Sequence, residues 1–223
     1  MDYILIILAF LIATAAQMYL SASYQRYLKI SSSKNKTGFE VARAILDKHG
    51  LEKVYVTETT GTLTDHYDPT RKVIRLSRDI FHGDSIASVS VAAHEVGHAI
   101  QDKEKYGLLR LRDNLVPVAS FSNKAGYLAI LIGIFFSLYK LFWIGIGLEL
   151  VILLFHLVTL PVELDASRRA KQELLKNNLV TKKELSGCST MLTAAALTYV
   201  SSVVGIIIEL IRYIYLFGRN DKN

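Results

Sequence analysis

The chain has 223 residues, enough for one or two domains, and is 51% hydrophobic with a formal net charge of +6 at pH 7. A positive charge could attract nucleic acid, but the sequence has no basic segment interleaved with aromatic residues, which argues against nucleic-acid binding. The single cysteine, Cys188, excludes an intramolecular disulfide and a cysteine-rich metal site.

Charged residues are segregated along the sequence, and long apolar stretches separate them. Residues 3–20 carry no charge and are about as long as a bilayer crossing requires. A cleaved secretory signal is the alternative, but no lysine or arginine precedes this stretch, so we interpret it as a retained transmembrane helix. The basic residues after it place the following segment in the cytoplasm: Arg26, Lys29, Lys34 and Lys36.

The polar segment 24–113 predicts a small α+β portion. A capping box at residues 37–40 begins a helix that Gly50 ends. Residues 54–59 and 71–76 predict short strands, with turn residues between them. Asp84 or Ser85 is the expected N-cap of the next helix.

That next helix carries the sequence His94-Glu95-Val96-Gly97-His98. Histidines four residues apart project from one helix face and can bind one tetrahedral zinc ion. Glu95 lies beside that face, where it can act as general base on a zinc-activated water. The alternative is a chance motif on a helix surface. The apolar residues around the motif favour a buried metal site instead.

Three further apolar stretches predict transmembrane helices. Residues 117–139 and 141–160 form a hairpin that turns near Lys140, and residues 190–217 form the last span. The polar segment 161–187 lies between the last two spans. The predicted fold is therefore a mainly α membrane protein with about four transmembrane helices and a small α+β zincin-like cytoplasmic portion.

The hairpin returns the chain to the side that it left, so the segments 24–113 and 161–187 face one compartment, which their lysines and arginines identify as the cytoplasm. A catalytic zinc needs a third protein ligand, and hydrolases with a His-Glu-x-x-His helix often take it from a glutamate on a later helix. Glu163 is the expected ligand and Asp165 the runner-up, or a group that orients a ligating histidine. Alternatively, both are ordinary acidic residues at a helix N-terminus.

Other polar residues are weaker candidates. His66 or Tyr67 could stabilise the oxyanion of a peptidase, although a turn residue and a packed ring are the favoured interpretations. Glu149, His156 and Glu163 recur every seven residues and so share one helix face. They indicate either a polar interior of the helix bundle or charge pairs that stabilise helix packing.

Three segments carry a resemblance to a known family: residues 61–69, 91–101 and 160–167. Over nearly its full length the chain resembles the membrane neutral zinc metallopeptidases of bacteria, the YugP-like family. More distantly it is similar to the HtpX and CAAX prenyl endopeptidases. Those distant relatives have an aspartate four residues after the ligating glutamate. Here that position is Ser167, and the acid stands at Asp165.

The resemblance and the residues together predict an integral membrane zinc metalloendopeptidase of the bacterial plasma membrane, with its active site facing the cytoplasm. One zinc per chain, bound by His94, His98 and Glu163, would act with Glu95 as general base. The expected partners are the lipid bilayer and a peptide or membrane-protein substrate. The alternative is a non-catalytic zinc-binding membrane scaffold or sensor, which would have no use for a general base.

Overall fold

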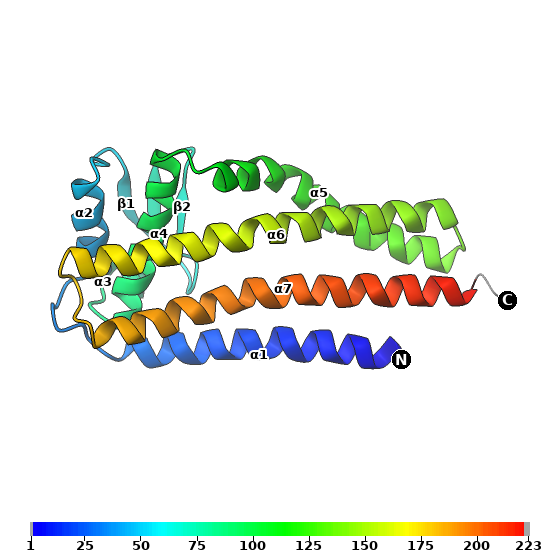
Figure 1. Ribbon diagram of the computed structural model, residues 1–223, viewed down its shortest axis with the longest axis horizontal. Helices are drawn as coiled ribbons and strands as arrows, with labels where there is room; N and C mark the ends of the chain where they lie inside the picture. The colour runs from blue at the N-terminus through cyan, green and yellow to red at the C-terminus, as the bar shows by residue number, and fades with distance from the viewer. Residues whose placement is uncertain (1, 221–223) are drawn as a thin grey trace. The chain divides into compact units, whose positions relative to one another are not determined.

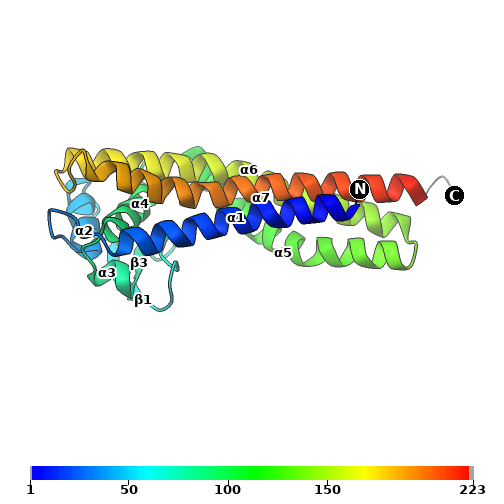
Figure 2. The same cartoon turned by 90° about the horizontal axis from the view of Figure 1, so that it is seen from below.

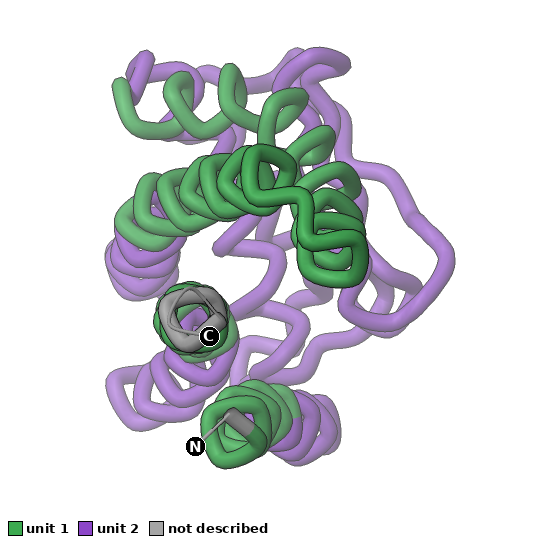
Figure 3. Tube along the Cα trace, turned by 90° about the vertical axis from the view of Figure 1, so that its right-hand side faces the viewer, with its two compact units in different colours: residues 1–17, 107–161, 197–223 green, residues 18–106, 162–196 purple. Residues whose placement is uncertain are grey.

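Helices dominate the computed structural model, which describes residues 2–220 (Figure 1). By contacts the chain divides into a helical unit, residues 1–17, 107–161 and 197–223, and a mixed unit, residues 18–106 and 162–196 (Figure 3). The elements in chain order are α1 (Asp2–Leu28), α2 (Gly38–Lys48), β1 (Tyr55–Thr59), β2 (His66–Asp68), β3 (Val73–Ser77), α3 (Arg78–His82), α4 (Ile86–Lys103), α5 (Gly107–Phe135), α6 (Tyr139–Lys176) and α7 (Glu184–Asn220).

Four helices, α1, α5, α6 and α7, are long and apolar enough to cross a membrane. Each extends beyond the apolar stretch from which it was predicted at one end or both. Hydropathy marks the part of a helix that can lie in a bilayer, whereas backbone hydrogen bonding continues through polar residues. The predicted spans are therefore parts of longer helices.

Helix α6 is continuous through Pro161, where the sequence predicted the start of a new polar segment. A proline removes one backbone donor from a helix but does not always end it. Beyond the proline, a fully buried apolar side chain recurs every fourth residue, which keeps one helix face against the core of the mixed unit. These side chains are Val162, Ala166, Ala170 and Leu174.

The hairpin between α5 and α6 turns at residues 136–138, and Lys140 lies in the first turn of α6. The expected turn near Lys140 is thus slightly displaced. Apolar residues continue across the connection, so hydropathy alone does not locate it. Ser137 adopts a left-handed conformation with φ 55°. At Gly133 an added Cβ would lie 2.7 Å from the Phe142 backbone nitrogen, so this glycine allows the two helices to approach closely.

The mixed unit contains a three-stranded sheet in the order β1-β3-β2. β1 pairs with β3 in parallel and β2 pairs with β3 antiparallel, which leaves β2 as an edge strand. The sheet contacts α3 and α4 (Figures 1 and 2). The two predicted strands are present with slightly shifted ends. The three-residue β2 falls within the segment that was predicted as a turn, because so short a strand has little periodicity.

The predicted helix ends in the mixed unit are confirmed. Thr37 and Glu40 form the capping box of α2, and Gly50 follows the helix with φ 63°. Ser85 is the N-cap of α4 and accepts a hydrogen bond of 3.0 Å from the Ser88 backbone N–H. The Ser85 cap marks where α4 begins, and with it the position of the histidine motif.

Candidate metal centre

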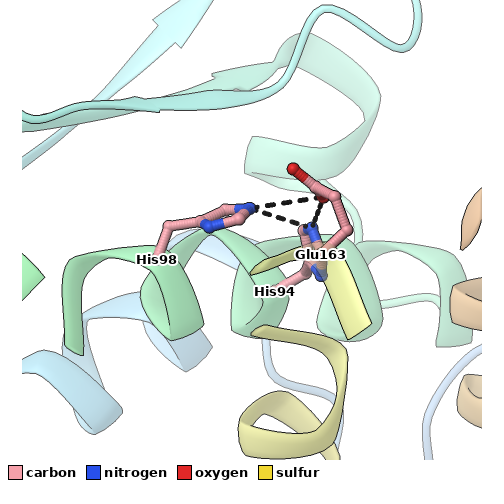
Figure 4. A group of neighbouring side chains, drawn as sticks. All are labelled: His94, His98 and Glu163. Carbon is pink, nitrogen blue, oxygen red and sulfur yellow. Dashed lines mark hydrogen bonds and ion pairs between the residues drawn. The ribbon is translucent and has the colours of Figure 1, made fainter. Parts of the chain in front are cut away.

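Helix α4 presents His94 and His98 on one face, and α6 brings Glu163 to the same place (Figure 4). All three residues belong to the mixed unit. Glu163 and His98 are buried, and His94 is half-buried. Among the described residues they form a group of one carboxylate and two imidazoles that could hold a metal ion.

The spacing of the three ligand atoms fits a tetrahedral zinc ion. His94 Nε2 lies 3.2 Å from His98 Nε2 and 3.2 Å from Glu163 Oε2, and the third distance, from His98 Nε2 to Glu163 Oε2, is 3.5 Å. A tetrahedron with metal–ligand bonds of about 2.0–2.1 Å has edges of roughly 3.3–3.4 Å. The spacing of the three atoms therefore fits one face of such a tetrahedron.

Gly97 explains how α6 comes close enough to supply Glu163. A Cβ at Gly97 would lie 2.6 Å from the carbonyl oxygen of Ala166 and 3.2 Å from its Cα. Only a glycine allows this approach between α4 and the backbone of α6. Glu163 and Ser167, on either side of the contact, thereby reach the histidines.

Gly97→Ala is expected to force α4 and α6 apart and to destabilise the protein by about 1–3 kcal/mol, because backbone atoms, unlike a flexible side chain, cannot move aside locally. Thermal unfolding of the purified protein measures this effect. Gly147→Ala in α6 is the matched control, because a Cβ there meets no atom within 4 Å. Equal unfolding temperatures for the two variants would contradict the close approach.

Hydrogen bonds orient both histidine rings. His98 Nδ1 lies 3.0 Å from Gln101 Oε1, and His94 Nδ1 lies 3.2 Å from Ser167 Oγ. The buried Gln101 amide donates to the Val162 carbonyl oxygen and to Asp165, each at 2.9 Å, so its oxygen must accept from His98. His98 then carries its proton on Nδ1, and Nε2 keeps the lone pair that a metal requires.

Asp165 is near the centre but its carboxylate is directed elsewhere. It pairs with Arg168 and, at 2.5 Å, with Arg169, whose guanidinium also pairs with Glu104. Burial would raise the pKa of Asp165, but hydrogen bonds from Gln101 and the two arginines lower it overall. Asp165 thus acts on His98 through Gln101. The structure groups Glu163 with the histidines, and the ligand role of Glu163 remains a prediction.

The two buried carboxylates of the centre differ in pKa. Burial raises the pKa of Glu95 to about 7, although the charge of His94 acts in the opposite direction. Burial would also raise the pKa of Glu163, but hydrogen bonds from His94 and His98 outweigh it and the pKa falls far below the usual range. Glu163 is therefore an anion suited to binding a cation, whereas Glu95 can gain and lose a proton near neutral pH.

His66 and Tyr67, the two candidates for stabilising an oxyanion, have other partners. His66 is exposed, and its Nδ1 lies 2.8 Å from the Thr64 carbonyl oxygen. The Tyr67 hydroxyl donates to Asp102 at 2.6 Å, whereas its backbone N–H donates to Glu95. Their oxyanion role remains a prediction. What Tyr67 contributes to the centre in the structure is the hydrogen bond from its backbone N–H to Glu95.

Sequence reasoning missed Gly97, Gln101 and Ser167 as parts of the centre. Gly97 lies inside the His-Glu-x-x-His motif and Gln101 just beyond it, and the motif specifies no residue type at either position. Gln101 follows His98 by three residues, a spacing that places both on one helix face and could have identified it. Ser167 follows Glu163 by four residues and offers a hydroxyl where the distant relatives have an aspartate.

The comparisons with known proteins agree with this centre. A family model described as "Putative neutral zinc metallopeptidase" matches residues 2–218, so the chain belongs to this family, as the sequence predicted. One relative, the "Putative membrane protease YugP" of Bacillus subtilis (strain 168), is 43% identical over 209 residues, 93% of this chain and 93% of that one. No solved structure matches the chain.

Proposed function

We propose that the protein is a membrane zinc endopeptidase. The observation that carries this proposal is the triangle of ligand atoms from His94, His98 and Glu163, with edges of 3.2, 3.2 and 3.5 Å. Catalytic zinc sites combine three such protein ligands with one open position. The family and the name of the Bacillus relative support the same reading.

The residues of the centre would divide the work as follows. When bound, zinc would polarise the scissile carbonyl and lower the pKa of water. Glu95 would take a proton from the attacking water as a C–O bond forms and return it to the amine nitrogen as the C–N bond breaks. A pKa of about 7 suits a group that must both accept and donate that proton near neutral pH.

An extended peptide substrate would find a binding edge on β2. This strand is at the edge of the sheet, and the backbone N–H of its Tyr67 already reaches Glu95. Main-chain pairing along such an edge holds a peptide backbone with little demand on its sequence. We therefore propose peptides or unfolded segments of membrane proteins as the substrate class.

Metal analysis tests the proposal. The purified protein should hold about one zinc per chain, because three ligands and one open position satisfy tetrahedral zinc. A chelator should abolish hydrolysis of an unfolded protein substrate, and added zinc should restore it. A zinc-loaded protein that hydrolyses no membrane or unfolded protein would favour the non-catalytic scaffold or sensor. A protein with no affinity for zinc would overturn both.

The four long apolar helices and the name of the Bacillus relative also support a location in the plasma membrane. The segments 24–113 and 161–187 are rich in lysine and arginine, which favours the cytoplasmic side for both. We propose four crossings, with the metal centre in the cytoplasm and the turn at residues 136–138 outside.

Cysteine labelling tests this topology. Ser137→Cys, in the turn between α5 and α6, should react with a membrane-impermeant maleimide on intact cells stripped of outer layers. Lys36→Cys, exposed ahead of α2, should react only after the membrane is opened. The buried Cys188 should stay silent in both. Labelling of Lys36→Cys alone on intact cells would invert the topology.

A further inference from the structure

The helical unit has an open cavity, and none of the residues that line it belongs to the candidate metal centre. Its volume is about 710 Å³, and all four long helices contribute to its lining. Apolar side chains and polar or charged ones both line it. Pockets of this size bind small molecules.

Charged groups line this cavity in unequal numbers. Glu149 of α6 and Glu209 of α7 are the carboxylates, and Arg212 is the guanidinium. Arg212 pairs with Glu209 at 2.5 Å and lies 4.5 Å from the centre of the Tyr213 ring. Among the side chains that the structure describes, residues 3–216, no lysine, arginine or histidine forms an ion pair with Glu149. Arg212, the arginine among the lining residues, is thus already paired.

Glu149 is the feature that indicates a ligand. A carboxylate among apolar side chains is costly unless a cation or donors accompany it. Gly126 of α5 packs closely against α6 beside it, since an added Cβ there would lie 3.1 Å from Leu148 Cβ and 3.4 Å from Glu149 Oε1. His156, which also lines the cavity, has a buried Nδ1 without a hydrogen-bond partner. Tyr127 adds an aromatic ring, which attracts cations.

The size of the cavity distinguishes a small ligand from a transmembrane segment. A helix about 10 Å wide occupies roughly 400 Å³ per turn, so the cavity holds fewer than two turns. We propose that it binds an organic cation with apolar substituents, whose charge lies beside Glu149. This site goes beyond the proposed peptidase function and requires no zinc.

Two ions of matched size and opposite charge test the proposal. Tetraphenylphosphonium should bind saturably to the protein in phosphatidylcholine nanodiscs, measured by equilibrium dialysis against empty nanodiscs, whereas tetraphenylborate should not. Glu149→Gln should weaken tetraphenylphosphonium binding at least about tenfold, because it removes the charged partner. Glu52→Gln, an exposed acid of the mixed unit, should bind as the wild type does.

Two further measurements keep the test independent of folding and of zinc. Ala13→Phe fills the cavity from α1 without changing its charge and should also weaken binding. Removal of zinc by a chelator should leave binding unchanged, so failure of the peptidase proposal would not affect this result. Saturable binding of both ions alike, no saturable binding of tetraphenylphosphonium, or unchanged binding in Glu149→Gln would overturn the proposal.

Discussion

Glu95→Gln is expected to lose hydrolysis and keep zinc. Glutamine has nearly the same shape but cannot take a proton from water, so the rate should fall by about 10²–10⁴-fold, the usual contribution of a general base. The zinc content should stay at that of the wild type, because His94, His98 and Glu163 are unchanged. Peptide hydrolysis and metal content are measured on the same preparation.

Glu52→Gln is the matched control for this experiment, because Glu52 is exposed in the mixed unit. It should hydrolyse substrate at the wild-type rate. Wild-type activity in Glu95→Gln would contradict the assignment of the general base. Loss of zinc from that variant would instead show that Glu95 maintains the metal centre.

Glu163→Ala should cause the largest loss of zinc affinity among substitutions outside α4. It removes one of three ligand atoms and the negative charge that both histidines contact. Asp165→Ala should have a smaller effect of about 10- to 100-fold, as expected for a group that orients a ligand. Zinc retained after dialysis against chelators of graded strength measures both.

Gln101→Leu provides a check on this ranking. Asp165 is linked to His98 through Gln101, so the two substitutions should weaken zinc binding to a similar degree. The double substitution should then cost less than the sum of the two single ones. A larger loss from Asp165→Ala than from Glu163→Ala would transfer the ligand role to Asp165.

The grouping of residues in the candidate metal centre was largely predictable from the sequence because helix geometry is regular. The spacing of four residues from His94 to His98 places both on one face once the segment is helical, and the apolar neighbours of the motif indicated burial. Glu163 was found by residue type and by counting membrane crossings. The structure groups it with the histidines, and its role as a ligand stays a prediction.

Other features depend on contacts between segments far apart in the sequence. Gly97 of α4 allows the backbone of α6 to come close at Ala166. Ser167 of α6 contacts His94 of α4. No local pattern marks such pairs. The continuation of α6 through Pro161 also depends on contacts with distant segments. The helix face after the proline is buried against the mixed unit, and this burial favours a continuous helix over a break at Pro161.

The edge strand β2 could not be predicted for a different reason, its shortness. Its three residues are too few for alternation to be recognised, and its flanking residues have turn chemistry. Pairing with β3 stabilises it, and the backbone of Tyr67 then lies at Glu95. A hydrogen bond from the backbone can be made by almost any residue type, so the sequence does not reveal it.

New N-termini in membranes provide the most direct test of the central claim that the chain is a zinc endopeptidase. Membranes from cells that lack the protein are incubated with the zinc-loaded wild type or with Glu95→Gln, and the N-termini are quantified by mass spectrometry. The wild type should generate a defined set of internal N-termini that Glu95→Gln and the chelated wild type do not. Identical sets of N-termini from all three samples would contradict the claim.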